Sequence, residues 1–136
     1  MIIGIGSDIL DTRRIARAIE KHPSRFAEKV LSAKELAQWQ QLTANQSINF
    51  VAKRWAAKEA FAKACGTGIR FPVRWHNISL TRDKLGKPLL ETHNELSQWL
   101  KERQVHRLHI SLSDDNHYCL AVVVLESQDK SGANHQ

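Results

Sequence analysis

The sequence has 136 residues, of which 20 are Lys or Arg and 14 are Asp or Glu, so its net charge at pH 7 is +6. This length fits one domain, and the charge favours an anionic partner: nucleic acid, a phosphorylated small molecule or an acidic protein. The two cysteines lack metal-ligand spacing, and the N-terminus has neither a basic leader nor a long apolar run. We therefore expect a cytoplasmic protein without disulfides, signal peptide or membrane span.

Residues 1–10 alternate in a way that predicts a strand with two unlike faces. One face carries isoleucines and the other carries two glycines and an acid: Ile3, Ile5 and Ile9 against Gly4, Gly6 and Asp8. Two glycines leave their face bare, as a bound ligand or a closely packed helix requires. Asp8 is then either a functional acid or a cap for the next helix, a position for which Asp11 is better placed.

Residues 11–22 predict a short helix with Ile15 and Ile19 buried, stopped by Pro23. Basic residues cover its remaining surface and continue after the break: Arg13, Arg14, Arg17, Lys21 and Arg25. This basic surface is either a solvated face or a contact for phosphates or for an acidic protein. Aromatic residues that would stack on bases are missing here, which counts against single-stranded nucleic acid.

The next residues predict two more short helical segments before the centre of the chain. Residues 24–31 continue helical, and Ser32 with Glu35 forms a capping box that opens another helix. We expect the polar residues 43–47 to be the connection that leads to the central helix.

Residues 50–68 predict the central helix, since six alanines lie between Ala52 and Ala64 and a glycine turn follows. Glu59 shares a face with Val51 and Trp55, so it lies where an apolar residue is expected. A carboxylate there needs a partner, either a base from a neighbouring element or a bound cation.

Three bases of this helix form a second set, which we expect on the adjoining surface: Arg54, Lys58 and Lys63. Each of them alone is typical of a solvated surface, and the glycine turn alone is typical of a helix end. Together with Glu59 they suit a metal ion and a phosphorylated ligand.

The second half of the chain predicts hairpins. Strands are expected at 75–82, 87–91, 107–113 and 118–125, with turns at 83–86 and 114–117 and a capping box from Thr92 to Glu95 opening one helix. Helices first and hairpins later argue for an α+β fold, with helices packed on an antiparallel sheet. We expect one domain over 1–126 and a disordered tail over 127–136.

Three motifs in this order resemble a known family. The first is Gly4, Gly6 and Asp8 in the first strand; the second runs from Phe50 through Arg54, Lys58, Glu59 and Lys63 to Gly66, Thr67 and Gly68; the third is Gly86, Lys87 and Pro88. Their order and spacing over residues 1–126 resemble holo-[acyl-carrier-protein] synthase, the small bacterial branch of the 4′-phosphopantetheinyl transferases.

The resemblance implies a Mg²⁺-dependent reaction for fatty acid biosynthesis. Coenzyme A would donate its phosphopantetheine arm to a serine of an apo acyl carrier protein and release 3′,5′-ADP. Such enzymes are typically homotrimers with sites between protomers.

The resemblance also implies roles for individual residues. Asp8 and Glu59 match the family's metal-binding acids, and with Lys63 they are the catalytic candidates. The coenzyme A candidates are Arg54, Lys58, Lys63, Gly66, Thr67, Gly68, Lys87 and Pro88, and the carrier-docking candidates are Arg14, Arg17, Lys21 and Arg25. The proton acceptor is either Glu59 itself or a metal-bound water that it orients.

One segment departs from the family pattern. Many members have a histidine after a Ser-x-Ser or Ser-x-Thr run in the penultimate strand, whereas here Asp114 follows Ser113, and His117 comes three residues later. Either Asp114 or His117 would have to replace that histidine.

Two other functions use the same residues differently. A metal-dependent phosphohydrolase would use the same acids and bases but transfer the phosphoryl group to water. A nucleic-acid-binding module would use the arginine-rich first helix and would leave Asp8 and Glu59 without a role.

Overall fold

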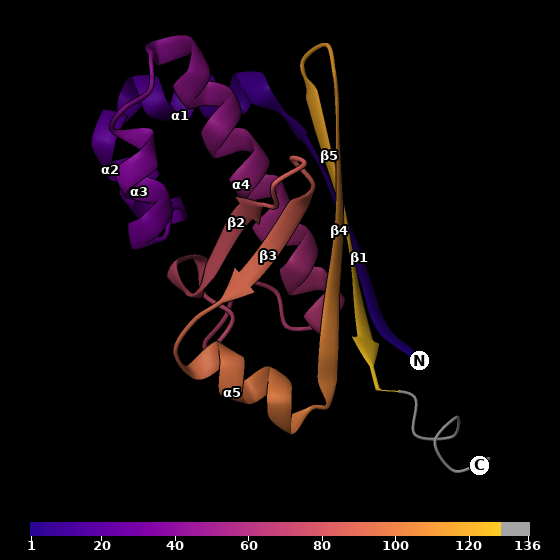
Figure 1. Cartoon of the computed structure of the whole chain (residues 1–136). Helices are drawn as coiled ribbons and strands as arrows, with labels where there is room; N and C mark the ends of the chain where they lie inside the picture. The colour runs from indigo at the N-terminus through magenta and orange to yellow at the C-terminus, as the bar shows by residue number, and fades with distance from the viewer. Residues whose placement is uncertain (129–136) are drawn as a thin grey trace, which may run out of the picture.

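The computed structural model describes residues 1–128, which form five helices, a short 3₁₀ turn and five strands (Figure 1). In chain order they are β1 (Ile2–Asp11), α1 (Thr12–Lys21), α2 (Pro23–Val30), α3 (Ala33–Trp39), α4 (Ala44–Cys65), η1 (Trp75–Asn77), β2 (Ile78–Arg82), β3 (Pro88–Thr92), α5 (Glu95–Glu102), β4 (Val105–Asp115) and β5 (Tyr118–Ser127).

The strands form a three-stranded antiparallel sheet in the order β1-β5-β4 and a separate β2–β3 hairpin. The long helix α4 lies against one face of the sheet, and α1, α2 and α3 gather at the far end of α4, away from α5 (Figure 1). The predicted α+β class with helices on an antiparallel sheet is confirmed. Within residues 1–128, no helix is both long enough and apolar enough to cross a lipid bilayer.

Helix ends follow local sequence signals closely. Asp11 caps α1 by accepting a hydrogen bond from the backbone N–H of Arg13 at 3.0 Å, and Ser32 and Glu35 form the predicted capping box of α3. Gly66 ends α4 in the left-handed conformation with φ of 77°, which glycine adopts without strain.

Three predicted boundaries are wrong. The strand predicted over 75–82 begins only at Ile78, because Trp75–Asn77 form the 3₁₀ turn η1. Residues 43–47 are not a connection, because Thr43 and Gln46 form a second capping box and α4 begins at Ala44. The capping box predicted from Thr92 does not form: the N-cap of α5 is Asn94, which makes no side-chain cap, and the Thr92 hydroxyl instead contacts the Ser97 hydroxyl at 2.9 Å.

The C-terminal hairpin is longer than predicted. β4 and β5 pair as far as Asp115 and Tyr118, so only Asn116 and His117 form the turn. β5 includes Ser127, whose backbone N–H donates to the Met1 carbonyl at 2.8 Å. The rest of the predicted tail, residues 129–136, lies outside the described residues.

The glycine face of β1 packs directly on the backbone of α4. A Cβ atom added at Gly4 would lie 2.1 Å from the Ala64 carbonyl oxygen, and one added at Gly6 would lie 2.0 Å from the Ala60 carbonyl oxygen. The two glycines therefore serve close helix packing, which is one of the two reasons predicted for their bare face. This contact sets the position of Asp8, the next residue on the same face.

We predict that Gly6→Ala destabilises the fold by about 3 kcal/mol, because the methyl group would overlap backbone atoms that cannot move without displacing α4. The free energy of unfolding from denaturant titration at fixed protein concentration measures this. The control is Ser24→Ala at an exposed position of α2, for which we expect a change within about 0.5 kcal/mol. Equal stability of the Gly6 variant and the control would contradict the packing described here.

Candidate active site

The candidate site lies along the seam between β1 and α4. Asp8 comes from the glycine face of β1, and Glu59 and Lys63 come from α4. The Lys63 ammonium donates to Asp8 Oδ1 at 3.2 Å and to the Ser7 carbonyl at 3.0 Å. The three predicted catalytic residues therefore come together, although Asp8 precedes Glu59 and Lys63 by more than fifty residues in the sequence.

Glu59 is half-buried, and the charge of Asp8 acts on its pKa. Burial raises the pKa of Glu59, the negative charge of Asp8 raises it further, and the positive charge of Lys63 opposes both effects. Among the described residues Glu59 forms no ion pair, whereas Asp8 is paired with Lys63. The predicted alternative, in which Glu59 pairs with a base from a neighbouring element, is therefore not what this structure contains.

The two acids suit a hard divalent cation. Within residues 1–128 no three His, Cys, Asp or Glu side chains converge as a ligand set, so the protein would supply only two carboxylates. Mg²⁺ accepts such a site, because it keeps several waters and takes phosphate oxygens of a substrate as further ligands. In this structure the Lys63 ammonium is the cation that contacts Asp8.

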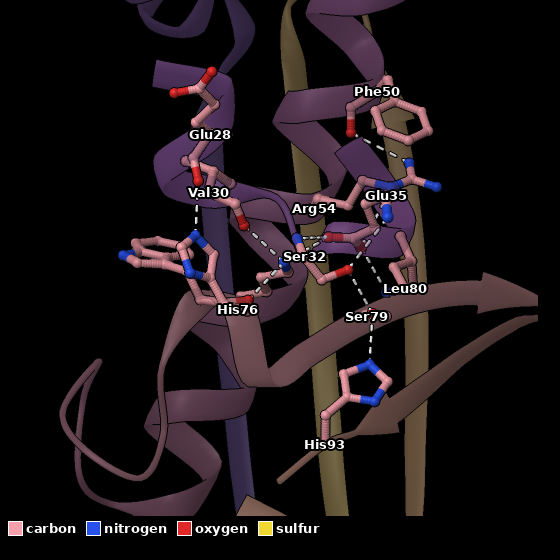
Figure 2. A network of polar contacts seen from close by, with 12 residues as sticks. Glu28, Val30, Ser32, Glu35, Phe50, Arg54, His76, Ser79, Leu80 and His93 are labelled. Carbon is pink, nitrogen blue, oxygen red and sulfur yellow. Dashed lines mark hydrogen bonds and ion pairs between the residues drawn. The ribbon is translucent and has the colours of Figure 1, made fainter. Parts of the chain in front are cut away.

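Lys58 and Arg54 are not on the surface, contrary to the sequence prediction. Lys58 is fully buried, and only 8% of Arg54 is exposed to solvent. The Lys58 ammonium donates to Glu35 Oε1 at 2.6 Å, to the Val30 carbonyl at 2.7 Å and to the Trp75 carbonyl at 2.9 Å (Figure 2). All three ammonium hydrogens are therefore used inside the protein, and we withdraw the assignment of Lys58 as a coenzyme A ligand.

Burial lowers the pKa of both bases. It lowers the pKa of Lys58 to about 8 and that of Arg54 to about 10, while Glu35 opposes the shift in each case. Glu35 was predicted only as a helix cap. The missed signal is that Arg54 and Lys58 lie four residues apart on an alanine-rich helix, so both face the same neighbour and need an acid there.

The predicted cationic set is also divided by the geometry of α4. An α-helix turns about 100° per residue, so the nine residues from Arg54 to Lys63 place these side chains about 180° apart. Arg54 faces α3 and the β2–β3 hairpin, where the charges of Glu35 and Arg82 act on its pKa. Lys63 faces β1.

The turn after α4 and the tip of the hairpin leave backbone and side chains exposed to solvent. Gly66 and Gly68 have φ of 77° and 67°, and a Cβ at either would meet no atom within 4 Å. Lys87 is exposed and Pro88 is half-buried at the start of β3. Their predicted role in coenzyme A binding stays a prediction, and so does that of Thr67.

The predicted carrier-docking residues are all exposed. Arg14, Arg17 and Lys21 lie on α1, Arg25 lies on α2, and all four are exposed. None of them forms an ion pair among the described residues, whereas neighbouring Arg13 is paired with Asp11 at 2.8 Å.

Asp114 and His117, the two candidates to replace the family histidine, lie at the turn between β4 and β5. Asp114 lies 3.3 Å from the Lys53 ammonium, so it joins the end of β4 to α4. The His117 carbonyl accepts a hydrogen bond from the Thr12 backbone at 2.7 Å, and its side chain is exposed. Asp114 is therefore engaged within the chain.

Comparisons with known proteins agree on one family. Residues 4–123 match the family model of the 4′-phosphopantetheinyl transferase superfamily. The chain is 39% identical over 132 residues to a holo-[acyl-carrier-protein] synthase from a Polaromonas species, covering 95% of this chain and 99% of the relative.

Two solved structures resemble this fold. The holo-[acyl-carrier-protein] synthase of Neisseria meningitidis has a TM-score of 0.89 and 45% identity, over 93% of this chain and 100% of that one. The Bacillus anthracis enzyme, solved in complex with CoA (3′,5′-ADP), has a TM-score of 0.78 and 38% identity, over 94% and 99% of the two chains.

We predict that Lys58→Met destabilises the fold by about 3–5 kcal/mol, because it leaves the buried Glu35 carboxylate without its closest cation. Denaturant titration measures the loss. Lys34→Met is the matched control, since Lys34 forms an exposed ion pair with Glu91 at 3.1 Å, and we expect at most about 1 kcal/mol there. A Lys58 variant of normal stability that fails to bind coenzyme A would restore the original assignment.

Proposed function

The chain belongs to the 4′-phosphopantetheinyl transferase superfamily, and from this premise we propose that it transfers the 4′-phosphopantetheine group of coenzyme A to a serine of an apo acyl carrier protein. The other product is 3′,5′-ADP. Relatives named holo-[acyl-carrier-protein] synthase match 93–95% of the chain at 39–46% identity, and one of the similar structures was solved in complex with CoA (3′,5′-ADP).

The observation in the structure that carries the proposal is the meeting of Asp8, Glu59 and Lys63 at the β1–α4 seam. Two acids and one base suit phosphoryl transfer, which depends on positioning and charge stabilisation more than on a covalent intermediate. A nucleic-acid-binding module would give this pair of half-buried acids no role, and the family match argues against it.

The reaction would depend on Mg²⁺ held by the Asp8 and Glu59 carboxylates. When bound, the ion would neutralise charge on the diphosphate of coenzyme A and so favour departure of 3′,5′-ADP. Both acids must be ionised to hold it. Because the pKa of Glu59 is raised, we expect metal affinity to fall with decreasing pH from a higher pH than for an ordinary glutamate.

Lys63 and Glu59 would contribute directly. The Lys63 ammonium is already directed at the seam, where it would neutralise charge that develops on the leaving phosphate. Glu59 would accept the proton of the carrier serine, either directly or through one water. Its raised pKa makes it a stronger base than an exposed glutamate, although one that ionises later.

The two substrates would approach from different sides of the site. Gly66–Gly68 and the residues Lys87 and Pro88 offer exposed backbone and positive charge to coenzyme A, together with Arg54. The exposed bases of α1 and α2 would guide the acidic carrier, since a complementary charge raises the rate of encounter. A cytoplasmic setting fits the two free cysteines, Cys65 and Cys119.

We also propose that the chain works as a homotrimer with sites between protomers. The sheet buries one face against α4, but its other face exposes an apolar patch: Ile5 is 63% and Ile9 is 67% exposed, and Leu120, which pairs with Ile9, is 39% exposed. Such a patch on a small protein marks an association surface. A second copy is the proposed occupant, because the patch belongs to the sheet itself and carries little charge.

The transfer is tested by incubating the protein with coenzyme A, Mg²⁺ and an apo acyl carrier protein. We expect the carrier mass to increase by one phosphopantetheine group, measured by intact-protein mass spectrometry. Cleavage of coenzyme A with an unmodified carrier would indicate the phosphohydrolase instead. We expect Asp8→Asn and Glu59→Gln to lower the rate at least about 100-fold, with excess Mg²⁺ restoring part of it. Full activity of either variant at limiting Mg²⁺ would contradict the metal assignment.

Assembly is tested with Ile9→Lys, which places a charge in the apolar patch. We expect this variant to lose the three-chain mass in light scattering and to lose transfer activity with it, because charges are costly to bury without a partner. Leu85→Lys is the control, since Leu85 is 96% exposed at the hairpin tip, and we expect its mass to be unchanged. A wild-type protein that is monomeric and fully active would end the trimer proposal.

A further inference from the structure

One buried carboxylate, that of Glu35, joins three parts of the fold (Figure 2). Its Oε1 accepts from the Ser32 backbone N–H at 3.0 Å and from Lys58 at 2.6 Å, and its Oε2 accepts from the Leu80 backbone N–H at 2.7 Å. Only 1% of Glu35 is exposed. The N-terminus of α3, the middle of α4 and the strand β2 are thus held around a single acid.

Glu35 also serves a second cation. Its Oε2 lies 3.6 Å from Arg54 Nε, which is too long for a hydrogen bond but close enough for an ion pair. One negative charge therefore faces two positive charges in a region that water scarcely reaches. Lys58 has the shorter contact and all its hydrogens engaged, so the unbalanced positive charge belongs to Arg54.

The guanidinium of Arg54 is held in place with donors to spare. It lies over the Phe50 ring at 3.5 Å, and one terminal nitrogen donates to the Phe50 carbonyl at 3.2 Å. Nε is buried and has no hydrogen-bond partner within the described chain. The ring beneath and the carboxylate beside it fix the plane of the guanidinium, and 9% of the side chain stays open to solvent.

A second arginine lies near enough for its charge to act on Arg54: Arg82, at the end of β2. One Arg82 nitrogen donates to the Gly86 carbonyl at 2.8 Å, in the hairpin that carries Lys87. Two guanidinium groups of like charge repel, and the single Glu35 carboxylate is already shared between Arg54 and Lys58. The excess of positive charge here would therefore favour an anion at the open edge of Arg54.

We infer that Glu35 is a positioning residue for coenzyme A: it fixes the Arg54 guanidinium so that its open edge receives an anionic group of that substrate. This inference rests on the proposed function for the identity of the anion. It assigns Glu35 no contact with coenzyme A, because the carboxylate is buried behind the two bases. Glu35 acts through Arg54, and the hydrogen bond from Lys58 holds the Glu35 carboxylate in place.

The inference requires that Glu35 and Arg54 act as one unit, which a double-mutant cycle tests. The dissociation constant for coenzyme A is measured by calorimetry for the wild type, Glu35→Gln, Arg54→Met and the variant with both changes. We expect each single change to weaken binding about tenfold, as for one charge-assisted hydrogen bond. We expect the double variant to bind no more weakly than Arg54→Met alone, with the KM for the carrier unchanged throughout.

A merely structural role for Glu35 gives different results. Glu35→Gln would then lower the unfolding midpoint and leave the dissociation constant of the folded fraction unchanged, or its effect would multiply with that of Arg54→Met. Either outcome overturns the inference. Glu91→Gln is the control, since it removes an exposed acid paired with Lys34, and we expect coenzyme A to bind it as tightly as the wild type.

A second variant covers the case in which Glu35→Gln does not fold. Combining Glu35→Gln with Lys58→Met removes the buried acid together with its closest cation, so the most costly unpaired charge is absent. We expect this variant to fold and still bind coenzyme A about tenfold more weakly; wild-type binding would overturn the inference. Failure of the proposed function is distinct, because then the wild type itself would bind no coenzyme A or would leave the carrier unmodified.

Discussion

The contact between the backbones of β1 and α4 is the constraint on which the site depends. Where Gly4 and Gly6 meet the carbonyls of Ala64 and Ala60, strand and helix approach more closely than any side chain would allow. This brings Asp8 against the helix face that carries Glu59 and Lys63. Two acids and one base can then share one seam, although each alone is an ordinary charged side chain on its strand or helix.

The opposite side of α4 is fixed by charge rather than by close packing. A buried ion pair contributes little net stability, because the cost of desolvating both groups offsets their attraction. What Glu35 and Lys58 provide is a fixed orientation: the carboxylate has partners in α3, β2 and α4, and only one rotation of α4 satisfies them all. The helix is thus held by glycines on one side and by an ionic cluster on the other.

Local signals predicted most of the elements, because a cap, a turn or the alternation of a strand depends on residues only a few positions apart in the sequence. The Ser32 box, the Gly66 helix end and the alternation of β1 are of this kind. The failures involve contacts between distant residues. The spacing of Arg54 and Lys58 indicates that both need an acid, but nothing near Lys58 identifies that acid as Glu35, twenty-three positions earlier. The Thr92 box failed because Asn94 begins α5 with a positive φ, which the local pattern does not reveal.

The orientation of α4 also explains why a small chain would need neighbours. Arg54 and Lys63 lie on opposite sides of the helix and about 13 Å apart along its axis, so one protomer cannot present both at a single point. Yet both are bases that the proposed donor would use, one near the hairpin and one at the acidic seam. The apolar outer face of the sheet offers a way to bring another copy's surface beside the seam. A site shared between protomers, as proposed above, would let one chain supply the acids and Lys63 while another supplies Arg54.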